Sequence, residues 1–271
     1  MFLTVDGAKL YYEVRGSGPL LLIAQSGEGD AGRSVDLADR LVDRYTVVTY
    51  DRRGLSRSEL AEPERGVRMT QHADDVHRLL AELTDRPALM LGCSMGASIG
   101  LHLAVRHPEQ LAVLVAHEPV SPALLPAERR PHHVRELLDL QRVHRDGGLQ
   151  AAVPEMARVL GIDPVNQEVE PDRTPMPMTP QRAANFAYFI QWEFTAVIQA
   201  ELDVEAVAGS PVRIVPAVGS ATAPDVFDRH CALELARIRE TQAREFPGGH
   251  NGNTTHPRAY AARLTEVLGE R

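Results

Sequence analysis

The chain has 271 residues, of which 44% are hydrophobic and 24% are charged. These values are ordinary for a globular protein of one large domain or two small ones, and they exclude extensive disorder. The formal net charge is −8, and the sequence contains no block of basic residues. Because a non-specific binder of nucleic acid or of an anionic membrane needs such a block, we expect neither partner.

The two cysteines, Cys93 and Cys231, are too few for a disulfide framework, and neither belongs to a CxxC pair. The first residues have no basic flank followed by an apolar core, so no signal peptide is expected. No apolar run approaches the ~20 residues that span a bilayer. The sequence therefore predicts a cytoplasmic globular protein, either a monomer or a homodimer.

The first part of the chain alternates short apolar runs with amphipathic stretches. Strands at 2–5 and 10–14 are predicted to form a hairpin, because they flank the turn-forming pair Asp6-Gly7. Further strands are predicted at 20–24, 46–50, 88–91 and 111–116, with helices near 34–42, 70–83 and 95–106. Short, continuously apolar strands separated by helices are typical of a parallel sheet covered on both faces.

The pattern changes after Pro119. Residues 120–205 contain no convincing strand, and helices are predicted near 129–144, 149–160 and 181–202. The alternation then resumes, with strands at 212–218 and near 243–246, a helix near 225–239 and a closing helix after 256. We predict one α/β core domain made of residues 1–119 and 206–271, interrupted by a helical cap domain of residues 120–205.

The motif that carries chemistry is Gly92-Cys93-Ser94-Met95-Gly96, which follows a predicted strand and opens a predicted helix. A serine on such a turn presents its Oγ above the sheet edge, and the flanking glycines allow backbone to approach closely. Ser94 is therefore the predicted nucleophile. The Met95 N–H, at a helix N-terminus, is a predicted oxyanion donor, and Ser26 or Gly27 after the strand 20–24 is expected to supply the second.

A serine nucleophile requires a base. In a sheet of this kind the expected chain order is serine, acid, histidine, with the histidine on the loop after the last strand. His250 alone among 11 histidines combines that order with that context, because it ends the loop-forming run Phe246-Pro247-Gly248-Gly249-His250. His132 and His133 lack a metal-ligand spacing such as HExxH, and no nucleotide-binding loop occurs. We expect no metal and no cofactor.

The acid of the triad has two candidates. The turn after the strand 212–218, where the acid commonly lies, contains no carboxylate before Asp225. Glu118 lies in His117-Glu118-Pro119 at the end of a predicted strand, where sites on such sheets gather. Glu118 is favoured because a triad is defined by role rather than by position. Asp225 is the reserve, because a helix N-cap or first-turn acid would explain it.

Aromatic residues are concentrated within positions 186–194 of the predicted cap. Phe186, Phe189 and Trp192 repeat every three residues and would form one stripe of a helix. Most of this stripe is expected to pack the cap onto the core domain. A site covered by it would be apolar and would favour a hydrophobic acyl or lactone substrate, which Tyr188 and Phe189 are predicted to contact.

The stretch Tyr50-Asp51-Arg52-Arg53-Gly54-Leu55-Ser56-Arg57-Ser58, the GCSMG turn and the PGGH loop together resemble the α/β-hydrolase superfamily across essentially the whole chain. More narrowly, the runs GCSMGAS, HEP, VGSATAP and PGGH followed by Thr255-His256-Pro257 resemble the zearalenone-lactone hydrolase group and its actinobacterial relatives. The resemblance implies the α/β-hydrolase fold with a helical cap and an acid at Glu118. It also implies a cap tryptophan in the substrate pocket, which Trp192 matches.

These observations predict a serine hydrolase that cleaves a small hydrophobic carboxylic ester or lactone. Ser94 would attack the carbonyl, His250 would take its proton, and Glu118 would orient the imidazole. A C–C hydrolase, a cyclase or an acyl transferase on the same triad stays open, because the fold does not select the reaction. A ligand-binding protein with little turnover is the alternative from another class, and the Ser–His pair argues against it.

Overall fold

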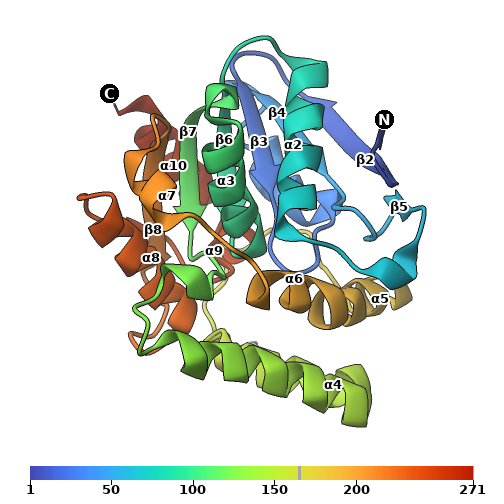
Figure 1. Ribbon diagram of the computed structural model, residues 1–271. Coiled ribbons are helices and arrows are strands. Elements are labelled where there is room, and N and C mark those ends of the chain that lie inside the picture. Colours follow the sequence, from blue (N-terminus) through green and yellow to red (C-terminus); the bar gives the residue numbers. More distant parts are fainter. Residues whose placement is uncertain (164–165, 271) are drawn as a thin grey trace.

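The computed structural model describes residues 1–163 and 166–270, and its centre is one sheet (Figure 1). The strands are β1 (Phe2–Val5), β2 (Ala8–Arg15), β3 (Leu20–Ala24), β4 (Thr46–Tyr50), β5 (Glu59–Leu60), β6 (Ala88–Cys93), β7 (Leu111–His117), β8 (Arg213–Gly219) and β9 (Arg244–Phe246). Their order is β1-β2-β4-β3-β6-β7-β8-β9, and β5 pairs with β2. β2 is antiparallel to its neighbours, whereas each pair from β4 to β9 in that order is parallel.

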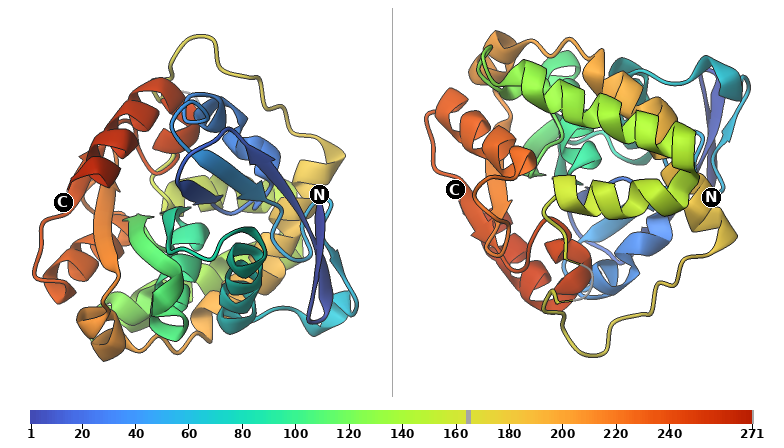
Figure 2. Two further views of the ribbon diagram at one scale, coloured as in Figure 1. Left: turned by 90° about the horizontal axis from the view of Figure 1, so that it is seen from above. Right: turned by 90° about the horizontal axis from the view of Figure 1, so that it is seen from below.

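Helices cover both faces of the sheet, as the continuously apolar strands predicted. The helices are α1 (Val35–Asp39), α2 (Met69–Leu83), α3 (Met95–Arg106), α4 (Arg130–Val159), α5 (Pro180–Tyr188), α6 (Phe194–Ile198), α7 (Val204–Gly209), α8 (Phe227–Ile238), α9 (Gly252–Thr255) and α10 (Pro257–Gly269). In β3, Leu21 and Ile23 pack with α1 and α10, while Leu22 and Ala24 pack with α2 and α3. Figure 2 shows these two helical layers on opposite sides of the sheet.

Most predicted elements are present. The structure differs from the prediction where a helix bends or is interrupted, and in short elements that were not predicted. The two helices predicted at 129–144 and 149–160 form α4, which bends at Gly148, where φ is 69° (Figure 2). The long helix predicted at 181–202 is interrupted by a π-helical turn, Phe189–Glu193, between α5 and α6. The short elements β5 and α7 have no predicted counterpart, because two and six residues carry little periodic signal.

The chain between β7 and β8 forms no strand in its described residues, 120–163 and 166–205. α4, α5 and α6 lie across the carboxyl ends of the parallel strands (Figure 1), and we call residues 120–205 the helical segment. Its standing as a separate cap domain stays a prediction. Within the described part of the chain, no helix combines the length and apolarity that crossing a membrane requires.

Candidate active site

Ser94 occupies the sharp turn between β6 and α3. Its φ of 54° and ψ of −115° are strained for a residue with a Cβ, as expected of a nucleophile held on such a turn. A Cβ at Gly92 would lie 2.6 Å from the Cα of Ala97, and a Cβ at Gly96 would overlap the backbone of Ala24. Both glycines are therefore required for the turn to pack between its own helix and β3.

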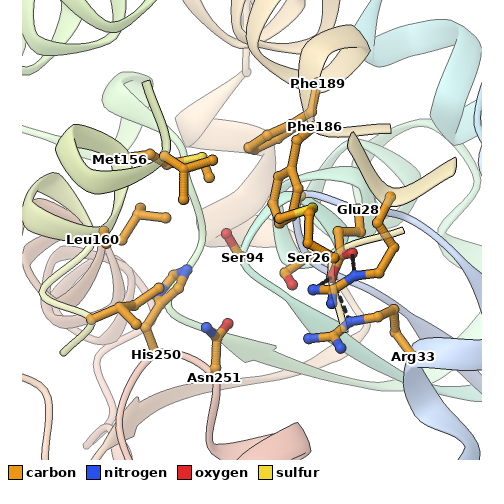
Figure 3. Close-up of a pocket in the computed structure, with 16 residues that line it drawn as sticks. Ser26, Glu28, Arg33, Ser94, Met156, Leu160, Phe186, Phe189, His250 and Asn251 are labelled. Atoms are coloured by element: carbon orange, nitrogen blue, oxygen red, sulfur yellow. Dashed lines mark hydrogen bonds and ion pairs between the residues drawn. The ribbon is translucent and has the colours of Figure 1, made fainter. Parts of the chain in front are cut away.

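Ser94 lines a cavity of about 210 Å³ between the carboxyl edge of the sheet and the helical segment (Figure 3). The cavity is walled mainly by apolar side chains from the helical segment: Val153, Met156, Leu160, Met178, Phe186 and Phe189. His250 and Asn251 line it from the loop after β9, and Ser26 and Gly27 line it from the loop after β3. The predicted nucleophile, base and oxyanion loop are therefore all at one cavity.

Glu118 directly follows β7 and is fully buried, with a positive φ of 45°. Its Oε2 lies 2.8 Å from Nδ1 of His250, and its Oε1 accepts the Gly219 N–H at 2.8 Å. Burial raises the pKa of Glu118, but the hydrogen bond with His250 and the Gly219 N–H help to lower it to about 2. The carboxylate is therefore ionised, and it fixes one side of the imidazole.

The other side of the His250 ring faces the cavity. Among residues 1–163 and 166–270, Nε2 of His250 is buried with no hydrogen-bond partner, so no hydrogen bond joins it to Ser94. Figure 3 shows a ring nitrogen of His250 turned toward the side of the cavity where the Ser94 hydroxyl lies. Burial lowers the pKa of His250, but the hydrogen bond to Glu118 and the charges that Asp228 and Glu118 carry when ionised outweigh it, and the pKa is raised. Catalytic hydrogen bonds are often long before substrate binds.

A second carboxyl group, on Asp228, reaches the same imidazole and was not predicted. Its Oδ2 lies 3.4 Å from Nδ1 of His250, and the side chain is fully buried. Neither carboxyl oxygen has a hydrogen-bond partner in the described part of the chain, and burial raises the pKa of Asp228 to about 8. The spacing of Asp228, Cys231 and Leu235 along α8 places an acid on the helix's buried face, which was the available signal.

Asp225, the reserve candidate for the acid, lies elsewhere. It is exposed in the turn before α8, and it acts electrostatically on His230. Among the described residues it makes no hydrogen bond or ion pair with His250, so the structure brings Glu118 rather than Asp225 to the imidazole. The two residues between Asp225 and Asp228, Val226 and Phe227, are buried and carry the chain from the surface into the core.

The loop after β3, where the sequence predicts an oxyanion donor, is held in place by Arg52. This fully buried guanidinium donates to the carbonyls of Gln25 at 2.6 Å, Ser26 at 2.7 Å and Gly27 at 3.1 Å. It also donates to both carboxylate oxygens of Glu193, at 2.8 and 2.7 Å. Because the C=O and N–H of one peptide point in opposite directions, the N–H groups of Ser26 and Gly27 point away from Arg52.

Only one of the three aromatic residues predicted at the substrate pocket lines the cavity. Phe189 does so, and its ring fills the space that a Cβ at Gly27 would need. Tyr188 packs over Gly54 and Trp192 over Gly66, and neither lines the cavity. The predicted stripe assumed 3.6 residues per turn. The π-helical turn Phe189–Glu193 is wider, so it rotates Trp192 away from the side that Phe189 faces.

Two groups of side chains outside the cavity bring metal-ligating atoms together. One comprises His77, His107 and Glu109, and the other comprises His132, His133 and Glu136. The second group forms because Glu136 lies one helical turn beyond the two histidines, with its Oε2 2.5 Å from Nδ1 of His133. Neither group contains a residue that lines the cavity.

Comparisons with known proteins agree with this architecture. Residues 19–166 match the family model described as the alpha/beta hydrolase fold. The chain is 40% identical over 270 residues to the uncharacterized hydrolase YraK of Bacillus subtilis strain 168, covering 98% of this chain and 94% of that protein.

Solved structures show the same fold at lower identity. A bromoperoxidase from Bacillus anthracis aligns with a TM-score of 0.73 and 20% identity, covering 97% of this chain and 96% of that one. The enol-lactonase from Burkholderia xenovorans LB400 aligns with a TM-score of 0.66 and 19% identity over 100% of both chains. The predicted fold class is therefore confirmed. The chain belongs to the α/β-hydrolase family, and it is a hydrolase.

Proposed function

We propose that this hydrolase cleaves carboxylic esters or lactones with an apolar acyl part, through an acyl-enzyme on Ser94. The observation that carries the proposal is the 2.8 Å contact between Nδ1 of His250 and Glu118, beside the cavity that Ser94 lines. An ionised carboxylate on one imidazole nitrogen leaves the other nitrogen to act as a base. Nε2 of His250 meets that requirement, because it has no partner among the described residues.

The reaction proceeds in two halves. Ser94 Oγ attacks the carbonyl carbon while Nε2 of His250 accepts the hydroxyl proton, and Glu118 stabilises the resulting imidazolium. His250 then gives that proton to the leaving alkoxide, which departs and leaves an ester on Ser94. Water attacks this ester after losing a proton to His250, and Ser94 recovers its proton as the acid leaves. A lactone yields a single hydroxy acid.

Backbone N–H groups stabilise the negative charge on the carbonyl oxygen in both halves. Met95 is the first residue of α3, so its N–H has no acceptor within the helix. The second donor is the N–H of Ser26 or Gly27, on the loop whose carbonyls Arg52 holds. Each such donor is worth about 3–4 kcal/mol of transition-state stabilisation.

The substrate class follows from the cavity walls. Met156, Leu160, Phe186 and Phe189 favour an apolar acyl or lactone ring. The resemblance to the zearalenone-lactone hydrolase group would also place a tryptophan there. Because Trp192 packs over Gly66 instead, the proposal does not extend to the substrate of that group.

A fluorophosphonate probe tests the proposal directly. The folded protein should be labelled at Ser94, identified by peptide mass spectrometry, and His250→Ala should abolish the labelling. Ser220→Ala, at an exposed serine after β8, is the matched control and should label like the wild type. Absence of label on folded wild-type protein would overturn the proposal in favour of a ligand-binding protein.

A further inference from the structure

One wall of the cavity carries a cluster of three charged side chains that the proposed reaction does not use. Glu28 lies on the loop after β3, Arg33 in the following 3₁₀ turn, and Arg182 on α5. Their side chains are only 6%, 19% and 20% exposed, respectively. A charge that is removed from water is costly unless it is paired. The hydrogen-bond and ion-pair partners of each side chain therefore show whether a charge in this cluster is left unpaired.

All three guanidinium nitrogens of Arg182 donate to protein oxygens. Its Nε and Nη2 both donate to the Glu28 carboxylate, and its Nη1 donates to the carbonyls of Met176 and Pro177. This bidentate pairing neutralises Glu28. Four of its five N–H groups therefore have acceptors in the protein, and its charge is paired with Glu28.

Arg33 is not engaged to the same extent. Its Nε lies 2.5 Å from Glu28, but its Nη1 meets only the thioether sulfur of Met176, which is a weak acceptor. Nη2 has no hydrogen bond to any residue in the described ranges 1–163 and 166–270. With two guanidinium groups against one carboxylate, the cluster keeps one positive charge in excess, and Arg33 carries it.

Apart from Glu28, no carboxylate in the described chain forms an ion pair with Arg33. Asp30 is bound to the Gly32 N–H at 2.6 Å and to the Ser56 hydroxyl, and Asp36 to the N–H and hydroxyl of Thr174. Burial lowers the pKa of Arg33, and it stays lowered because Arg182 and Arg173 oppose the raising effect of Glu28 and Asp30. A buried cation whose charge is only partly paired is stabilised when an anion binds beside it.

The unused donors face the reaction site. Figure 3 shows the guanidinium end of Arg33 directed into the cavity that Ser94 and His250 line. The carboxamide of Asn251 projects into the same cavity, opposite Arg33. An anion between these two groups would receive donors from both sides.

We propose that Arg33, assisted by Asn251, forms a subsite for a carboxylate group on the substrate. The preferred substrate is then an ester or lactone that carries a free carboxylate beyond an apolar spacer, which contacts the Met156 and Phe189 side of the cavity. A carboxylate fits because its planar pair of oxygens matches the fork of a guanidinium. This inference rests on the proposed esterase chemistry at Ser94.

Two chromogenic esters of the same length test the subsite. Mono-p-nitrophenyl adipate carries a free carboxylate, and p-nitrophenyl adipamate carries a neutral carboxamide in its place. The wild type should prefer the carboxylate ester in kcat/KM by about 10–100-fold, the range of one charge-assisted hydrogen-bonded contact. Arg33→Gln should remove this preference mainly through KM, while it keeps activity on the neutral ester within about threefold.

Arg142→Gln is the matched control, because Arg142 is an exposed arginine of α4 and the substitution removes the same charge. It should keep the full preference. Equal wild-type kcat/KM on the two esters would overturn the subsite, and so would an Arg33→Gln variant that loses both activities equally. A stronger preference for the analogue with a phosphonate in place of the carboxylate would overturn the assignment to a carboxylate.

Binding separates this inference from the catalytic proposal. In calorimetry, adipate should bind to Ser94→Ala at least tenfold more tightly than adipamide does, and adding Arg33→Gln should remove the difference. If fluorophosphonate labelling fails but this selectivity is found, the triad proposal fails and the subsite stands. If the esters are cleaved without preference and adipate shows no selectivity, the subsite alone fails.

Discussion

The carboxyl edge of the sheet and the helical segment build the two halves of the site in different ways. At the sheet edge, Ser94 and Glu118 are held in positive-φ conformations at strand ends, and His250 is hydrogen-bonded to Glu118. The helical segment contributes aromatic and aliphatic walls from a bent helix and a π-helical turn. Short turns at strand ends position the proposed reacting groups, while side-chain packing between distant elements determines what fits beside them.

The two regions meet at a buried ion pair. Arg52 belongs to the sheet edge and Glu193 to the helical segment, and neither side chain is exposed. Through this pair the helical segment helps to hold the loop that carries the proposed oxyanion donors. The proposed reacting groups and the cavity walls are therefore coupled, although they come from separate parts of the chain.

The largest effect is expected within the sheet edge. Glu118→Gln keeps the size of the side chain but removes the charge that orients and stabilises the imidazolium, so kcat on an ester should fall about 10²–10⁴-fold. Circular dichroism should show an unchanged fold. Asp225→Asn is the matched control and should keep wild-type kcat. A Glu118→Gln variant with wild-type kcat would refute the proposed role of this carboxylate.

The next effect is expected where the two regions meet. Arg52→Lys keeps the charge but cannot reach three carbonyls and both oxygens of Glu193, so the loop at Gly27 should shift. We expect kcat to fall about 10–100-fold with little change in KM, since misplacing a transition-state donor by about 1 Å has effects of this size. Arg142→Gln controls for a surface arginine. An unchanged kcat together with a lowered melting temperature would show that the pair is only structural.

A smaller effect is expected in the wall of the helical segment. Phe189→Leu should raise KM several-fold for esters with long or aromatic acyl groups and leave small acetyl esters nearly unchanged, because the ring contacts only larger substrates. Trp192→Phe should leave KM unchanged for both series, since Trp192 packs over Gly66. A KM change in Trp192→Phe as large as that in Phe189→Leu would contradict the distinction between the two residues.

The smallest effect on kcat is expected for Asp228. Its pKa of about 8 means that it is mainly protonated at neutral pH. Asp228→Asn should therefore keep kcat within about threefold at pH 7. Between about pH 4 and pH 8 the native state keeps a proton that the unfolded chain has lost, so this group lowers stability as pH rises.

The substitution should remove that penalty. The melting temperature of Asp228→Asn relative to the wild type should rise by about 10 °C or more across this pH range, as followed by calorimetry. Asp225→Asn should show no such trend, because Asp225 is exposed. A constant difference in melting temperature would contradict the assigned protonation of Asp228.

The local sequence was sufficient to predict the turns that follow the strands, where Ser94 and His250 lie. The glycines around Ser94 and the loop-forming run before His250 encode their backbone shapes within a few residues, so their positions could be predicted before any contact was known. The same holds for the parallel sheet, because each buried strand carries its apolar run within itself.

Only the tertiary structure decided the contacts between distant residues. Arg52 and Glu193 are 141 positions apart, and nothing near either one indicates its partner. The same limit applies to the burial of Asp228 against His250 and to the π-helical turn that rotates Trp192 away from the cavity. Local backbone preferences depend on neighbouring residues in the sequence, whereas side-chain packing depends on which elements the fold brings together.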